Sequence, residues 1–287
     1  MTTSHRFKRA ARDLAAKRGI SYTAARRLLL EQRPSRANCD LLVRLGRVGH
    51  SSTTPTPGVS GSTEEVALDL AFAVQQHLPP GIVVSGTTGS GWTVALAALV
   101  SGFLARTGPG SQVVLAADVN DPAGLLPADP RIRHVDLGAE PDVAPDALAA
   151  TLKGLGTAAS DGAHDIPRLV IVRLHGHVDA GSDAAVSAAL QEIVRLGRST
   201  RTTLVLATNA LVDAAAYLPV HMWSALVVMR QRDEHSPAEA ARLLGGPVTA
   251  TDVREAPAGR GWALLPGCSD AVALTLDPPS ALWPGRH

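Results

Sequence analysis

Residues 82–99, IVVSGTTGSGWTVALAAL, contain the residue types that a phosphate-binding loop needs. A strand-like apolar run leads into a short polar loop, and a helical pattern follows it. The loop consists of Gly86, Thr87, Thr88, Gly89, Ser90 and Gly91. Glycines let consecutive backbone N–H groups turn toward one centre, and a helix N-terminus adds about half a positive charge. The segment therefore predicts a site for phosphate groups; the alternative is a turn that only packs a helix against a strand.

The loop matches the pattern G-x-x-x-x-G-K-[ST] except at the lysine. Gly86, Gly91 and Thr93 hold matching positions, and Trp92 stands where lysine is expected. That lysine interacts with the β- and γ-phosphates, and removing one such interaction costs about 3 kcal/mol, or ~100-fold in rate. Because an indole has one neutral donor, we expect nucleotide binding through the backbone with impaired hydrolysis. Thr93 is the expected protein ligand for Mg²⁺.

Short β-branched runs alternate with helical patterns around this loop. Strands are expected over 82–85, 112–116, 132–136, 169–172, 204–207, 225–229 and 262–265. Helices are expected over 93–105, 146–155, 184–196 and 237–244, the last capped by Ser236. Apolar strands separated by helices predict an α/β fold, with a mostly parallel sheet covered by helices on both faces.

The stretch GIVVSGTTGSGWTVALAALVSGF resembles the Walker A region of the FtsK/SpoIIIE/TraB family of DNA-translocating ATPases, whose loop commonly reads G-T-T-G-S-G-K-S. Residues 112–135, 196–212 and 218–246 resemble later segments of that family in the same order, with Asn209 where the family has Gln. The resemblance implies a P-loop NTPase fold of the RecA/FtsK type. It also implies ATP and Mg²⁺ as cofactors, a sensor role for Asn209, and DNA, a second copy or a partner ATPase as binding partners.

The second catalytic element of the family departs from its pattern here. In the family an apolar strand ends in Asp-Glu, one carboxylate for Mg²⁺ and one for the attacking water. In PRLVIVRLHGHVD, residues 167–179, those positions are Arg173, Leu174 and His175. The resemblance therefore implies a translocase fold without an intact catalytic set. His175 and His177 suggest either a metal site or two surface histidines.

Residues 1–50 are strongly basic. They hold twelve Lys or Arg against three acidic residues, a net charge of +9, which leaves −8 on the remaining chain. Helical patterns over 6–18 and 22–31 flank Gly19-Ile20-Ser21 and resemble a helix-turn-helix. That resemblance implies DNA contacts from Arg18, Tyr22, Thr23, Arg26 and Arg27. Two helices are too small to fold alone, so a third is expected over 37–46. An arginine-coated helical hairpin is the alternative.

The segment SSTTPTPGVSGS, residues 51–62, has the composition of a flexible linker. We therefore expect a basic helical segment over 1–50, the linker over 51–62 and a P-loop NTPase-like domain over 63–287. Ser62 and Glu65 predict a capping box for a helix that ends near His77. Two widely separated cysteines, no signal peptide and no ~20-residue apolar run predict a cytoplasmic protein without a membrane span.

Three functions remain open from the sequence. The first is a hydrolysis-impaired FtsK-like protein that binds DNA or a partner ATPase during plasmid or chromosome transfer or segregation. The second is an active DNA translocase in which Arg173 or a partner's arginine supplies the missing charge. The third is a helix-turn-helix regulator whose large domain mediates self-association.

Overall fold

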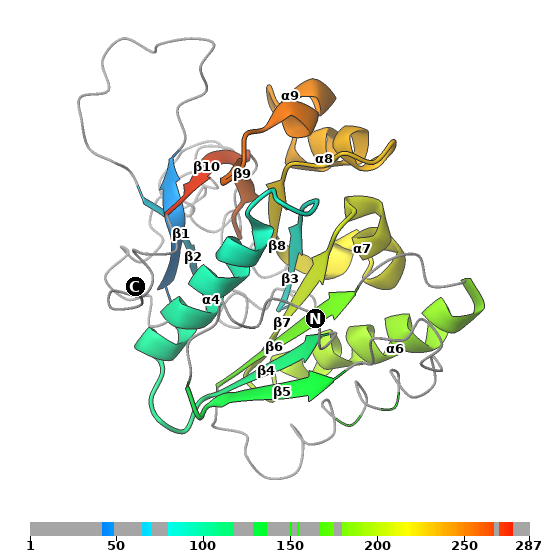
Figure 1. Ribbon diagram of the computed structural model, residues 1–287. Helices are drawn as coiled ribbons and strands as arrows, with labels where there is room; N and C mark the ends of the chain where they lie inside the picture. Colours follow the sequence, from blue (N-terminus) through cyan, green and yellow to red (C-terminus); the bar gives the residue numbers. More distant parts are fainter. Residues whose placement is uncertain are drawn as a thin grey trace, which may run out of the picture.

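The computed structural model describes residues 42–48, 65–69, 80–117, 129–136, 150, 154, 167–174, 180–266 and 270–277. In these residues a ten-stranded sheet has the order β2-β1-β10-β9-β8-β3-β7-β6-β4-β5 (Figure 1). The strands from β8 to β5 in that order pair in parallel, and β9, β10, β1 and β2 extend the sheet with antiparallel pairs. The predicted α/β class with a mostly parallel sheet is confirmed.

The parallel strands are β3 (Gly81–Ser85), β4 (Gln112–Ala117), β5 (Ile132–Asp136), β6 (Arg168–Leu174), β7 (Thr202–Thr208) and β8 (Trp223–Met229). The antiparallel strands are β1 (Leu42–Val48), β2 (Glu65–Asp69), β9 (Arg260–Leu264) and β10 (Val272–Leu276). All residues of β3, β6 and β7 are buried. Burial on both faces explains why the central residues of these strands form apolar runs in the sequence.

Helices cover both faces of the sheet. On one face lies α4 (Trp92–Arg106), which packs on alternate strand residues such as Ile82, Leu115 and Ile171. On the other face lie α6 (Ala180–Gly197), α7 (Leu211–Tyr217), α8 (Ser236–Leu244) and α9 (Ala250–Glu255) (Figure 1). A short 3₁₀ helix, η3 (Val220–Met222), precedes β8. None of the described helices has the length and apolar character needed to cross a membrane.

Two expected helices are wrong where the structure describes them. Residues 42–46 of the expected third helix belong to β1, and residues 65–69 of the helix after Ser62 form β2. β1 pairs with both β10 and β2, and Leu45 is 1% exposed in the core beneath α4. Strand pairing with distant residues outweighs the local helical pattern because tertiary contacts override intrinsic propensity.

The start of α8 also differs from expectation. The expected cap, Ser236, is the first helical residue and His235 is the N-cap. The side chain of Asp233 accepts hydrogen bonds from the backbone N–H groups of His235 and Ser236, at 3.1 and 2.6 Å. The Ser236 hydroxyl instead accepts from the backbone N–H of Val212, which joins α8 to α7.

Several sequence expectations lie outside the described residues. They include the five residues expected to contact DNA, the linker, and His175 with its neighbour His177. Of the helix expected over 146–155, residues 150 and 154 are helical. The division into a basic segment, a linker and a P-loop NTPase-like domain stays a prediction.

Candidate functional site: the glycine loop after β3

The loop after β3 is held by three separate parts of the sheet. The backbone N–H of Gly86 donates to the carbonyl of Thr208 at the end of β7, at 3.1 Å. The N–H of Thr87 donates to the carbonyl of Arg230, directly after β8, at 2.9 Å. The carbonyl of Ser90 accepts from the N–H of Gly259, just before β9, at 2.8 Å. The loop is therefore fixed on both sides of β3 at the carboxyl ends of the parallel strands, where α/β sheets bind ligands.

Three glycines have geometrical reasons to be in this loop. Gly89 and Gly91 have φ angles of 76° and 99°, a region that side chains strongly disfavour. A Cβ on Gly91 would lie 3.0 Å from the backbone nitrogen of Gly259. A Cβ on Gly86 would lie 2.5 Å from the Ser90 hydroxyl oxygen and 2.7 Å from the Met229 Cβ. The backbone of the loop thus has a fixed, close-packed form that the glycines permit.

Two polar groups at the loop have no hydrogen-bond partner among the described residues. Ser90 is fully buried, and its hydroxyl has no hydrogen-bond partner among the described residues. The Nε of Arg230 is also buried without such a partner in the described part of the chain, while its Nη2 donates to the Gly89 carbonyl at 3.4 Å. Gly91 caps α4 without a side-chain cap, and the first turn of α4 has no acidic residue. An unneutralised helix N-terminus with unsatisfied donors beside it fits a phosphate group.

The threonines of the loop occupy different environments. The Thr87 hydroxyl donates to the Arg230 carbonyl at 3.1 Å, which couples the loop to the end of β8. Thr88 and Gly89 are exposed at the tip, while Thr93 is half-buried in the first turn of α4. The predicted phosphate-loop residues are therefore brought together as one turn, with Trp92 as the exception.

Trp92 points into the protein core. It is 3% exposed and belongs to the apolar cluster between α4 and the sheet. The guanidinium carbon of Arg173, from β6, lies 4.5 Å from the centre of the Trp92 ring. This is the geometry of a cation–π contact, which is strengthened when both groups are withdrawn from water. Two of the positions predicted to depart from the family pattern therefore contact each other directly.

The alternation of side chains along β6 decides which residue faces the loop helix. Leu169 and Ile171 pack on the α4 face, so Arg173 lies on that face as well. Leu174 packs in the cluster on the opposite face, which contains α6. Among the described positions where the family has acids, Arg173 is the one on the face of Trp92.

These residues fit a phosphate ligand but do not fit Mg²⁺. Arg173, 8% exposed, places a guanidinium where the family has a carboxylate, and a guanidinium has no lone pair with which to coordinate Mg²⁺. Thr93 keeps a hydroxyl, but no group of three or more His, Cys, Asp or Glu in the described residues is placed to hold a metal ion.

A polar network that the sequence analysis missed lies beneath the loop. Gln231 is fully buried, and its Nε2 donates to the Ser85 hydroxyl at 2.9 Å. The Thr208 hydroxyl lies 3.4 Å from the same oxygen and donates to the Ala210 carbonyl at 2.9 Å. Asn209, the expected sensor, directly follows Thr208 and is half-buried. The sequence signal for this network was a polar residue at the end of an apolar strand, or two residues beyond it, in three strands: Ser85 in β3, Thr208 in β7 and Gln231 after β8.

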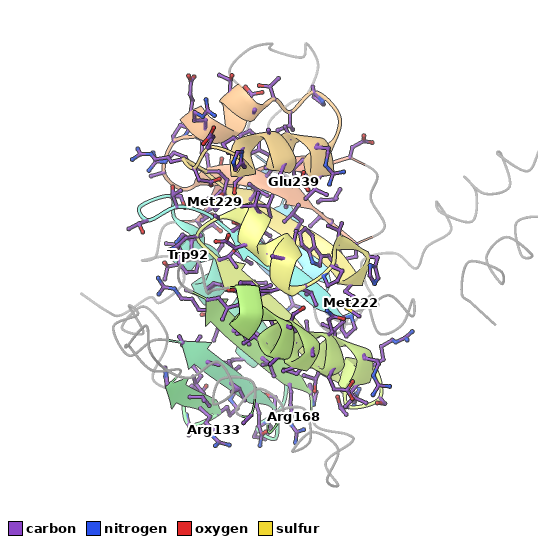
Figure 2. All side chains as sticks on the ribbon, turned by 90° about the vertical axis from the view of Figure 1, so that its right-hand side faces the viewer. Trp92, Arg133, Arg168, Met222, Met229 and Glu239 are labelled. Carbon is purple, nitrogen blue, oxygen red and sulfur yellow. The ribbon has the colours of Figure 1, made fainter. Side chains whose placement is uncertain are left out.

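A cavity of about 490 Å³ lies away from the loop, at the opposite ends of β4, β5 and β6. Arg131, Arg133 and Arg168 line it, and Figure 2 shows Arg133 and Arg168 far from Trp92. Arg131 is held by an ion pair with Asp129 at 2.7 Å and donates to the Leu104 carbonyl at 3.0 Å. This cavity is not part of the loop site.

Known proteins match this chain in the comparison of structures and not in the comparisons of sequence. The sequence matches no protein-family model, and no curated protein matches it either. The cytoplasmic domain of the type VII secretion ATPase EccC from Thermomonospora curvata is similar, with a TM-score of 0.65, 18% identity, and coverage of 85% of this chain and 29% of that one. The chain therefore spans less than a third of that protein.

Two further structures extend the comparison. VirB4 of Thermoanaerobacter pseudethanolicus has a TM-score of 0.60 at 9% identity, and the match covers 82% of this chain and 96% of VirB4. The pCW3 conjugation coupling protein TcpA, in its monomer form with ATPγS, has a TM-score of 0.51 at 15% identity, covering 85% and 70%. With the glycine loop, the parallel sheet and these matches together, the chain has the fold of the FtsK/SpoIIIE-like P-loop ATPases.

Proposed function

We propose that this protein is a nucleotide-binding, hydrolysis-impaired member of the FtsK-like group that acts on DNA or on a partner ATPase. The proposal rests on one observation, the contrast between the backbone of the loop and the side chains at two neighbouring positions. The backbone loop and its unsatisfied donors are preserved, whereas Trp92 and Arg173 occupy the lysine and acid positions and stack on each other.

The consequence for catalysis follows from the charges. Phosphoryl transfer depends on cations that offset charge in the transition state and on a carboxylate that positions water. Trp92 is buried in the core, and Arg173 cannot accept a proton from water. Binding depends instead on backbone N–H groups, which these substitutions leave in place. The protein therefore binds nucleotide as a structural or regulatory ligand.

The proposed context is the transfer of DNA on the cytoplasmic side of a membrane. The similar structures include a secretion ATPase and a conjugation coupling protein. The net charge of +9 on residues 1–50 supports contact with a polyanion such as DNA. A second copy of the chain or a partner ATPase would complete the assembly.

A second candidate is an active ATPase in which Arg173 supplies the missing positive charge. The position of its guanidinium beside Trp92 favours this candidate, since it brings a cation next to the lysine position. The two candidates predict opposite outcomes in one assay.

ATP hydrolysis by the full chain, measured with and without duplex DNA, separates the candidates. We expect turnover well below ~1 s⁻¹, the low end of ordinary enzymes, in both conditions. An Arg173→Ala variant should leave that low rate unchanged. Turnover near or above ~1 s⁻¹ that Arg173→Ala abolishes would establish the second candidate.

A further inference from the structure

We propose that Arg230 supplies the positive charge that the loop lacks and binds a second phosphate, so that the site selects nucleoside di- and triphosphates over monophosphates. The inference rests on the proposed nucleotide-binding function and names the residue that gives it phosphate specificity. Neither the loop nor the first turn of α4 carries a cationic side chain, because Trp92 is neutral and is buried in the core. A second phosphate therefore needs a cation from another element.

The side chain of Arg230 contacts the tip of the loop. Its Nη2 lies 3.4 Å from the Gly89 carbonyl oxygen, and a Cβ on Gly89 would lie 3.9 Å from the same nitrogen. A hydrogen bond of that length to a neutral carbonyl is weak, whereas a bond from a guanidinium to a phosphate oxygen is short and charge-assisted. A phosphate at the loop would therefore displace the carbonyl as the partner of Arg230.

The backbone of Arg230 is fixed to the loop more firmly than its side chain. Its carbonyl accepts hydrogen bonds from the backbone N–H and the hydroxyl of Thr87, at 2.9 and 3.1 Å. Met229, the residue before it, packs in the same apolar cluster as Trp92 (Figure 2). A Cβ on Gly86 would lie 2.7 Å from the Met229 Cβ and 3.1 Å from the Trp92 Cβ. The end of β8 thus holds Arg230 beside the loop, close to the lysine position.

The charge of Arg230 has no ion-pair partner among the described residues. Its buried Nε also has no hydrogen-bond partner there. Nε and Nη2 form one edge of the guanidinium, and Arg131 uses the same edge to bind both carboxylate oxygens of Asp129, at 2.9 and 2.7 Å. Phosphate oxygens suit this two-donor edge equally well. Arg230 therefore presents an anion-binding edge that the described residues leave unsatisfied.

A first phosphate has its own place within the loop. Ser90 is fully buried, and its hydroxyl has no partner among the described residues. That hydroxyl would lie 2.5 Å from a Cβ on Gly86, which places it inside the turn. With the N-terminus of α4 directly after it, this part of the loop suits one phosphate. The guanidinium at the loop tip is then left for the next phosphate, which a monophosphate does not have.

Calorimetric titration of ATP and of AMP into the full chain tests this inference. We expect the unaltered protein to bind ATP about tenfold more tightly than AMP. Arg230→Gln should weaken ATP binding by about tenfold and change AMP binding by less than about twofold, because only ATP offers the guanidinium a second phosphate. Arg230→Lys should retain part of the ATP affinity, since it keeps the charge but loses the two-donor edge. Arg232→Gln removes the same charge from an exposed arginine two residues further along; it is the matched control and should change neither affinity.

The outcomes separate this inference from the function on which it rests. If the unaltered protein binds neither ATP nor AMP, the proposed function is overturned and the inference with it. ATP binding that Arg230→Gln leaves unchanged, or weakens no more than Arg232→Gln does, overturns the inference and leaves the nucleotide-binding function standing. Equal affinities of the unaltered protein for ATP and AMP also overturn the inference, and this comparison decides the matter even if the Arg230 variants fail to fold.

Discussion

At the scale of single residues, Trp92 and Arg173 act as one unit. Trp92→Lys removes a buried indole and brings an ammonium close to the guanidinium. We expect it to lower the free energy of unfolding by about 3–5 kcal/mol, since removal of a buried aromatic side chain alone costs that much. Urea unfolding measures this decrease.

The double variant Trp92→Lys/Arg173→Asp tests whether the two residues are coupled. Its opposite charges attract, so its decrease in stability should be smaller than the sum of the two single decreases by about 1–3 kcal/mol. Additive decreases would mean that the side chains at these two positions do not interact.

Gly91 sets the backbone of the phosphate loop. Gly91→Ala should lower the free energy of unfolding by more than ~1 kcal/mol, because its φ is 99° and a Cβ would press on Gly259. It should also weaken ATP binding, because the N–H groups of the loop would shift. The matched control is Gly110→Ala, where a Cβ would meet no atom within 4 Å. Thermal unfolding and calorimetry compare the pair; equal effects would argue against a fixed loop.

At the scale of elements, α9 depends on a reciprocal cap. The Thr249 hydroxyl accepts from the backbone N–H of Asp252 at 3.2 Å, and the Asp252 carboxylate accepts from the Thr249 N–H at 2.9 Å. Thr249→Ala should therefore reduce stability by about 1 kcal/mol. Thr249→Ser, which keeps the hydroxyl, is the control and should reduce it less in the same chemical unfolding experiment.

The junction between α4 and β5 should make stability depend on pH. The hydrogen bond and charge of Arg131 lower the pKa of the Asp129 carboxyl, and Arg131 in turn donates to carbonyls near the end of α4. Because the folded pKa is depressed, this contribution is present above the unfolded pKa of about 4 and disappears as pH falls through the folded pKa. Unfolding curves between about pH 5 and 2 measure it.

Asp129→Asn is the variant for that measurement. It removes the titrating group, so its stability should fall less steeply than that of the unaltered protein over the same acidic range. Identical pH profiles would show that the ion pair contributes nothing to acid sensitivity.

At the scale of the whole molecule, the basic residues before β1 are predicted to bind duplex DNA through its phosphates. Since β1 is paired inside the sheet, deleting residues 1–61 would also disturb the core. The appropriate change is Arg18, Arg26 and Arg27 to Gln in the full chain. We expect weaker DNA binding and a salt slope that falls by about 0.9 for each phosphate that the variant no longer neutralises.

Affinity measured at several salt concentrations gives the slope. The control variant has Gln in place of the exposed Arg106, Arg195 and Arg242. It loses the same total charge, and we expect it to alter the slope less. If both triple variants changed the salt slope equally, DNA binding would depend on the net charge of the protein rather than on residues 1–50.

The sequence by itself determined the central layers of the fold. The parallel strands β3 to β8, the helices α4, α6 and α8, and the glycine loop were all expected from local patterns. A strand buried on both faces is apolar through its central residues whatever its neighbours are, so its own residues reveal it. Likewise, glycines with positive φ are needed by the loop itself.

The antiparallel edge was decided by the tertiary structure. β1 and β2 were expected to be helical and β10 was not expected, because these strands form through pairing with each other and with β9. Local patterns do not record a partner that is distant in the sequence.

For the site, the sequence predicted which residues are altered, and the structure showed how they are placed. The resemblance to the family pattern predicts that Trp92 stands at the lysine position and that Arg173, Leu174 and His175 stand at positions of acids. It does not show that Trp92 turns into the core, that Arg173 rather than Leu174 faces α4, or that the two altered positions meet at 4.5 Å. Strand register and the side-chain alternation of β6 determine that contact, and both are fixed only when the sheet assembles around β3.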